Sequence, residues 1–279
     1  MEWHIFDKCV RTVFDPELFS GPDYIYNRPD LYTDDYETYL IICGRQKYEA
    51  EVTFKGEEAR PAVRLMPLPD RALSLLAKAV LRDHPEIKKV VFEQTYGRVG
   101  EVRDTNHFRV IFPSTADELM ERLHRHERKN LRRRFKQLNE DYGETHFAEY
   151  EGDAIPQQLV ETFFRFKKAS HNRDYPMSAA EYLSFYHVTN AYALMLGERV
   201  IAVRFTCEQC EIVNAENFSY DQEFAHYSAG LQIYNYTLCR LVEKGKKEIF
   251  LGGGTNAQKY LYGSIEEQTH TCIVKRRGA

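Results

Sequence analysis

The sequence predicts an α+β fold made of two related halves, each a mixed, mostly antiparallel sheet flanked by helices. Short runs rich in β-branched and aromatic residues alternate with helical patterns, and the same order of elements occurs twice. With 43% hydrophobic and 13% aromatic residues among 279, the chain can bury a sizeable core. We expect one half over residues 1–112 and the other over residues 113–279.

The first half begins with strands separated by Gly44 and Gly56. A helix follows from Leu68 to Asp83, with apolar residues at helical spacing and a stop before Pro85. A buried strand comes directly after it. The expected strands are residues 39–43, 48–54, 62–66 and 87–92.

The second half repeats this order, with a helix from about Gly230 to Glu243 between its strands. In both halves a Lys-Lys pair precedes the apolar strand after the helix, which favours two related halves. A single unrepeated sheet is the alternative. The expected strands are residues 192–196, 200–207, 211–217 and 245–251.

A basic helix is predicted between the halves. Thr115 and Glu118 form a capping-box pattern at its start. The stretch Arg122–Lys136 holds eight Lys and Arg against one acid, Glu127, in a chain whose net charge is −4. A solvated helix face and a landing surface for phosphates, of a cofactor or of a tRNA, are equally good interpretations. Arg132 and Arg133 lie on the basic side of this helix.

Charge and cysteine content exclude several classes of protein. The net charge argues against a polybasic membrane anchor, and we expect neither a secretory signal nor a membrane span. Six cysteines at irregular spacing do not suit a disulfide scaffold, so a cytoplasmic protein is expected. Cys207 and Cys210 form one C-x-x-C without further ligands, so no metal site is predicted.

Two turns are candidates for chemistry. We expect the chain to open after Asn217, so that backbone amides of Tyr227, Ser228, Ala229 and Gly230 point at a pyrophosphate. An ordinary helix cap at Ser228 is the alternative. In the second turn, a strand ends at three glycines, residues 252–254, and Lys259 follows, placed to reach a phosphate or a carbonyl oxygen.

These features together resemble the GNAT superfamily of N-acetyltransferases, over about Glu118 to Val274. The closest likeness is to the cellulose-biosynthesis-type (CelD-like) acetyltransferases and the Fem-like aminoacyltransferases of peptidoglycan bridges. It rests on the arginine-rich helix at 131–134, the hairpins before Ser228, and the glycine turn before residues 259–263. A Lys-x-x-Phe-Gly stretch of the Fem-like enzymes is similar to Lys259–Gly263, with Tyr262 in place of Phe.

The resemblance implies tandem GNAT-like halves, of which the first is degenerate and the second catalytic. It also implies acyl transfer to an amine, with Lys259 engaging the acyl donor. The loop that commonly holds coenzyme A is not reproduced by residues 222–230. The donor therefore stays open between an acyl-CoA, such as acetyl-CoA, and an aminoacyl-tRNA held through Arg122–Lys136.

Direct attack by a neutral amine needs a base, an acid and a stabilised oxyanion, but no enzyme nucleophile. We expect Glu216 as the base, with Asp221 or His226 as alternatives, and Tyr260 as the acid, with Tyr262 as the alternative. The acceptor is an amine on a small molecule, sugar or peptide. A binding protein that kept the fold without the chemistry is the third hypothesis.

Overall fold

The computed structural model describes the chain in two compact units. They comprise residues 1–107 with 266–279, and residues 108–265. The half boundary after residue 112 stays a prediction. The described residues are 10–13, 24–27, 37–43, 46–61, 68–172, 174–186, 188–209, 211–254, 257–276 and 278. The predicted strand at 62–66 lies outside them.

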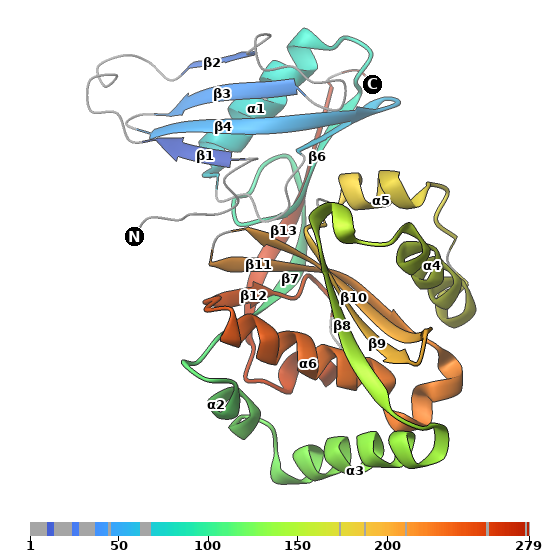
Figure 1. Cartoon of the computed structure of the whole chain (residues 1–279). Helices are drawn as coiled ribbons and strands as arrows, with labels where there is room; N and C mark the ends of the chain where they lie inside the picture. Colours follow the sequence, from blue (N-terminus) through green and yellow to red (C-terminus); the bar gives the residue numbers. More distant parts are fainter. Residues whose placement is uncertain are drawn as a thin grey trace. The chain divides into compact units, whose positions relative to one another are not determined.

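The first unit is built on three antiparallel strands, β3 (Glu37–Cys43), β4 (Gln46–Lys55) and β5 (Glu58–Pro61). Helix α1 (Asp70–Asp83) packs behind β3 and β4 with its apolar stripe buried (Figure 1). After it, β6 (Lys89–Thr95) runs parallel to β5 and antiparallel to β13 (Ile265–Lys275). Strand β1 (Val10–Val13) pairs with β4, and β2 (Tyr24–Asn27) pairs with β3.

The second unit has the same core order. Strands β9 (Asn190–Leu196), β10 (Arg199–Gln209) and β11 (Ile212–Tyr220) are antiparallel, and β8 (Thr145–Glu151) extends them beyond β9. Helix α6 (Ala229–Glu243) leads to β12 (Glu248–Phe250), which is parallel to β11. Strand β7 (Glu101–Ile111) pairs with β12 through its last residues. Each unit therefore has three antiparallel strands, a helix and a strand parallel to the third, which confirms the predicted α+β fold class with the same order of elements in both halves.

Alternating side chains divide the second sheet into two faces. Val203 and Phe205 pack under α4 (Gln157–His171) and α5 (Ala179–Phe185). Ala202 and Leu194 pack under α6 instead. Figure 1 shows α4 and α5 on one side of β9 and β10 and α6 on the other. Arg204, which lies between Val203 and Phe205 on β10, therefore points toward α6.

The single basic helix of the prediction is wrong, because the chain forms two helices, α2 (Ala116–Glu121) and α3 (Arg125–Tyr142). The His124 side chain caps α3 by accepting from the His126 N–H, and Arg122 donates to the Ile111 carbonyl at 2.7 Å. The Thr115 hydroxyl accepts from the Glu118 N–H, as predicted. Arg122 is thus the C-cap residue of α2, and its side chain makes a tertiary contact to β7.

Two further findings concern the described residues. No helix among them is long and apolar enough to cross a membrane. Within that same part of the chain, no group of three or more His, Cys, Asp or Glu side chains is arranged to hold a metal ion. Cys207 lies buried on β10, and Cys210 is outside the described residues.

Candidate active site

Strands β11 and β12 separate shortly after they begin to pair. Their parallel pairing covers only Ile212–Asn214 against Glu248–Phe250, although β11 continues to Tyr220. A β-bulge follows at Glu216, because Ala215 pairs with Thr206 and Asn217 pairs with Phe205. Two diverging strands leave backbone and side chains of the sheet interior open to a ligand at the point of separation. The separation begins three residues before the predicted Asn217.

Lys259 lies in α7 (Ala257–Tyr260), directly after the glycine turn that follows β12. Its Nζ donates to the carbonyl oxygens of Gly252 at 2.7 Å and Gly253 at 2.6 Å, and lies 5.1 Å from the centre of the Phe108 ring. Gly252 has φ +70, a conformation that glycine adopts without Cβ strain. The glycine turn therefore holds an ammonium group by its carbonyls.

The Lys259 side chain is only 8% exposed. Burial, with a smaller contribution from the charge of Arg204, lowers the pKa of Lys259 to about 8. The group is still mainly protonated at neutral pH. It is a positive charge in a region of low dielectric, where its effect on a developing oxyanion is larger than in water.

Arg204 is a residue that the sequence analysis did not single out. It lies on β10, is 3% exposed, and has its guanidinium carbon 4.5 Å from the centre of the Tyr234 ring. Its Nε and Nη1 atoms have no hydrogen-bond partner among the described residues. The available signal was a single charged residue within the apolar run Ile201–Phe205.

The two candidate acids differ in environment. Tyr260 is 47% exposed, and its ring packs edge-on against the same Phe108 ring that Lys259 contacts, at 5.1 Å. Tyr262 is fully buried, and its hydroxyl donates to Asn235 Oδ1 at 2.7 Å. Burial raises the pKa of Tyr262. The structure thus brings Tyr260 to Lys259 and commits the Tyr262 proton to Asn235.

The candidate bases lie along and beyond β11. Glu216 occupies the bulge, but its side chain lies outside the described residues. The Asp221 carboxylate accepts from Arg199 at 2.7 Å and caps the short helix η4 (Gln222–Tyr227). The His226 ring packs on Tyr227, with ring centres 3.8 Å apart. Glu216 remains the predicted base, and the structure pairs Asp221 with a cation.

The predicted donor loop is closely packed. The Tyr227 hydroxyl donates to Asp141 at 2.5 Å, and Arg134 donates to the Ser228 hydroxyl. Ser228 is the N-cap residue of α6, as the alternative interpretation expected, but its φ is 58 and its side chain makes no capping hydrogen bond to the helix. Ala229 is fully buried.

Gly230 is packed just as closely, because a Cβ on it would lie 2.6 Å from Tyr220 Cδ1. The small residues of this loop therefore let α6 approach β11 and η4. The contacts of the loop go to α3, η4 and β11, whereas those of Lys259 go to the glycine turn and β7.

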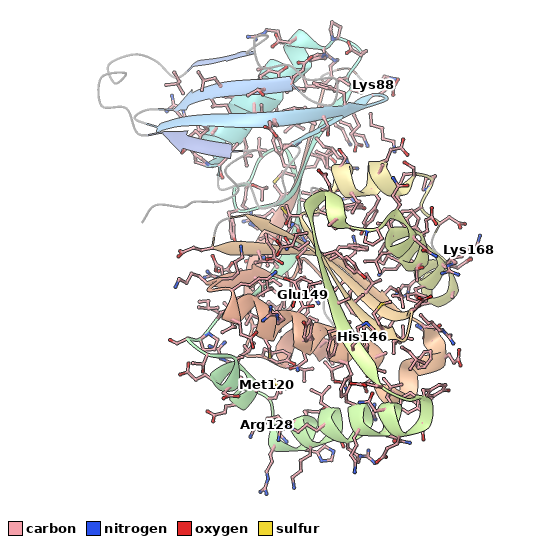
Figure 2. The ribbon with its side chains drawn as sticks, viewed as in Figure 1. Lys88, Met120, Arg128, His146, Glu149 and Lys168 are labelled. Carbon is pink, nitrogen blue, oxygen red and sulfur yellow. The ribbon has the colours of Figure 1, made fainter. Side chains whose placement is uncertain are left out.

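The arginines of the predicted phosphate surface are on the exposed side of α3. Arg132 and Arg133 are exposed and Arg128 is half-buried; Figure 2 labels Arg128 near the first turns of α3. Arg134, which falls on the apolar side of the helix, turns instead toward Ser228. Among the described ion pairs of this helix is Lys136 with Glu140, at 3.3 Å. This surface is open to a large anionic partner.

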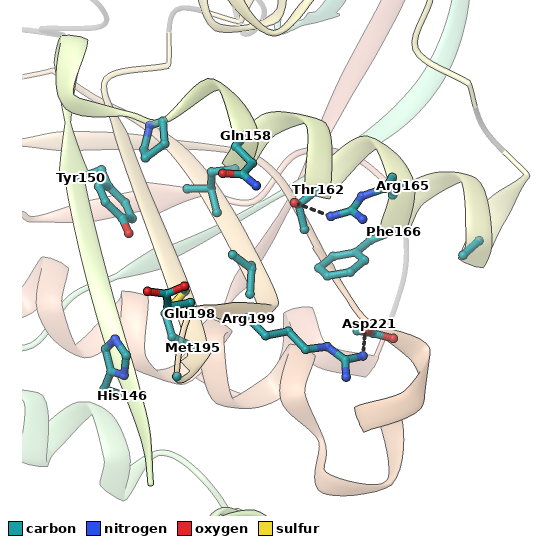
Figure 3. A pocket seen from close by; sticks show the side chains of 15 residues that line it. His146, Tyr150, Gln158, Thr162, Arg165, Phe166, Met195, Glu198, Arg199 and Asp221 are labelled. Carbon is teal, nitrogen blue, oxygen red and sulfur yellow. Dashed lines mark hydrogen bonds and ion pairs between the residues drawn. The ribbon is translucent and has the colours of Figure 1, made fainter. Parts of the chain in front are cut away.

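A cavity of about 870 Å³ lies on the α4 side of the sheet (Figure 3). Its walls come from β8, α4 and the turn between β9 and β10. His146, Arg165 and Glu198 are among its polar groups, and the candidate base Asp221 also lies in its wall. The Arg199 guanidinium reaches Asp221 across the cavity edge. Arg204 and Tyr234 lie on the opposite, α6 side.

Residues 125–260 match the family model of the acetyltransferase (GNAT) domain. Among solved structures, the C-terminal domain of a protein described as a lysylphosphatidylglycerol synthetase from Agrobacterium fabrum has 12% identity and a TM-score of 0.56, covering 82% of this chain and 81% of that one. The structure of FemX has 8% identity and a TM-score of 0.54, covering 89% and 88%. L-PGS from Bacillus licheniformis has 11% identity and a TM-score of 0.50, covering 83% and 81%. No curated protein sequence matches significantly.

Proposed function

The chain belongs to the GNAT superfamily, and on that premise we propose that it is an N-acyltransferase that moves an acyl group from an acyl-CoA-type thioester to an amine. The observation that carries the proposal is the buried ammonium of Lys259 at the place where β11 and β12 separate. A fixed positive charge of this kind stabilises the oxyanion that forms when an amine attacks a carbonyl.

The reaction proceeds by direct attack. The amine nitrogen forms a bond to the carbonyl carbon, the oxyanion collapses, and the carbon–sulfur bond breaks. Glu216 takes the proton that the amine loses, and Tyr260 supplies the proton that the leaving thiolate gains. Lys259 stays charged and holds the carbonyl oxygen or a neighbouring anionic group of the donor.

The proposal is tested by donor binding and by transfer. Acetyl-CoA and longer acyl-CoAs should raise the melting temperature, because a ligand of the native state stabilises it by mass action. Release of free thiol in the presence of an amine acceptor measures the reaction. Lys259→Ala and Glu216→Gln should each lower that rate by about 100-fold or more, and Lys78→Ala, at an exposed lysine on α1, is the matched control.

A donor panel in which acyl-CoA and aminoacyl-tRNA both leave the melting temperature unchanged would contradict the proposal. It would favour a binding protein on the same fold. The same conclusion follows if Glu216→Gln and Lys259→Ala leave every measured activity intact.

A second candidate, an aminoacyl-tRNA-dependent transferase, is favoured by the exposed cations of α3. RNA binding through about five of them should give a slope of about −3.5 to −4.5 in a plot of log affinity against log salt concentration. The double variant Arg132→Gln/Arg133→Gln should make that slope smaller by about 1.5. Acyl-CoA binding should show a much weaker dependence on salt.

A further inference from the structure

Arg204 is a cation that the sheet carries into the interior of the second unit. Its neighbours on β10, Val203 and Phe205, belong to the apolar core under α4 and α5. Strand alternation therefore directs Arg204 to the opposite face, against α6. There its guanidinium lies over the Tyr234 ring and 5.7 Å from the centre of the Phe218 ring.

Among the described residues, two nitrogens of this guanidinium lack the acceptors that a buried cation requires. Its Nε and Nη1 atoms are shielded from solvent and have no hydrogen-bond partner in the described part of the chain. Attraction to two aromatic rings offsets only part of the cost of removing a charge from water. Arg240 in the same unit shows the usual arrangement, since Glu149 and Glu243 both pair with it.

Other donors lie around Arg204. The Tyr234 hydroxyl is also buried, and among the described residues nothing accepts or donates a hydrogen bond to it. Burial raises the pKa of Tyr234 to about 12, so the hydroxyl keeps its proton at neutral pH. The charge of Arg204 contributes to the lowered pKa of Lys259, which places a second cation nearby. The described residues of this region therefore supply cations and a hydroxyl donor, and none of them is an acceptor for Nε and Nη1 of Arg204 or for the Tyr234 hydroxyl.

We propose that Arg204 and the Tyr234 hydroxyl form a buried subsite for a compact oxyanion, a phosphate or a carboxylate carried by a substrate, beside Lys259. A guanidinium pairs with two oxygens of such a group in a fixed plane, and the Tyr234 ring holds that plane. The assignment of the anion to a substrate rests on the proposed function, whereas binding of the anion itself does not.

Thermal unfolding with simple anions tests the subsite. Sodium phosphate and sodium acetate are titrated against the full chain, with sodium chloride at matched ionic strength as the baseline. Phosphate, acetate or both should raise the melting temperature with the logarithm of their concentration, by about 3 to 6 °C for each tenfold increase above the dissociation constant. The stronger of the two identifies the group as a phosphate or a carboxylate.

Arg204→Met removes the charge and keeps a long apolar side chain. It should abolish the rise in melting temperature with anion concentration. In chloride it should melt at or above the wild-type temperature, because a buried charge without a hydrogen-bond partner for Nε and Nη1 among the described residues is lost. Arg204→Lys keeps the charge without the planar guanidinium. Its dissociation constant for the anion should therefore be at least tenfold higher than that of the wild type. Arg240→Met, which removes a paired arginine of α6, should keep the wild-type response.

The subsite is excluded if neither anion raises the melting temperature of the wild type above that in chloride at the same ionic strength. It is also excluded if Arg204→Met responds as the wild type does, or if it melts well below Arg240→Met, which would indicate a structural role for the charge. A response that depends on Arg204 in a protein that transfers no acyl group would support the subsite and reject the proposed function. Acyl transfer with unchanged kcat and KM in Arg204→Met would support the proposed function and reject a substrate-binding role for the subsite.

Discussion

Raising the pH should stabilise the folded protein through Lys259. The pKa of this group is about 8 in the folded chain, against an ordinary value of 10.5. Between these values the unfolded chain binds a proton that the folded chain does not, so stability rises with pH by about 1.4 kcal/mol per unit. From pH 7 to pH 10 the gain from this one group is about 2 to 3 kcal/mol.

The measurement is a comparison of wild type with Lys259→Met. Urea unfolding at pH 7 and pH 10 gives the free energy of unfolding of each, and the groups that both proteins share cancel in the difference. The wild type should gain about 2 to 3 kcal/mol relative to the variant over this range. Lys78→Met controls for the loss of one lysine charge at an exposed site on α1.

A difference between wild type and Lys259→Met that is the same at pH 7 and pH 10 would refute this reasoning. It would mean that the two glycine carbonyls compensate the buried ammonium fully. If the free energy of unfolding of the wild type falls relative to that of Lys259→Met as the pH rises, the fold raises the pKa of Lys259.

Three other substitutions have defined outcomes. Tyr260→Phe should lower kcat about 100-fold; an unchanged kcat removes Tyr260 as the acid. Tyr262→Phe should lower the free energy of unfolding in urea by about 1 to 2 kcal/mol, through loss of the bond to Asn235. Gly230→Ala should cost about 1 to 3 kcal/mol, because the new methyl would meet Tyr220; equal urea midpoints would show that the ring moves aside freely.

Local patterns in the sequence were sufficient for the regular elements. The apolar spacing of residues 68–83 predicts α1, and the hydroxyl of Thr115 caps α2 as its pattern indicates. These features depend on residues a few positions apart. The break between α2 and α3 was not found in this way; at that break Arg122 contacts the carbonyl of Ile111, which is remote in sequence and lies on β7.

The site shows the same limit. A lysine after a glycine turn normally faces solvent, and only the fold places Lys259 on the carbonyls of Gly252 and Gly253. Ser228 is the N-cap residue of α6, but it is in the left-handed region and its hydroxyl accepts from Arg134 instead of from a backbone amide of the helix. Sequence spacing identified Lys259 as a candidate, but its burial and lowered pKa are properties of tertiary packing.

The burial of each cation determines how strongly it indicates a functional role. The exposed arginines of α3 remain hydrated, so their presence costs the fold little and is compatible with a surface that binds nothing. Arg204 lies inside the second unit, where a charge without acceptors destabilises the folded state. The fold keeps this cost, and the charge of Arg204 contributes to the lowered pKa of Lys259, so two buried cations influence each other in the second unit. Fixed charges of this kind stabilise a substrate anion or a transition-state oxyanion without reorganisation, which is the property that acyl transfer requires.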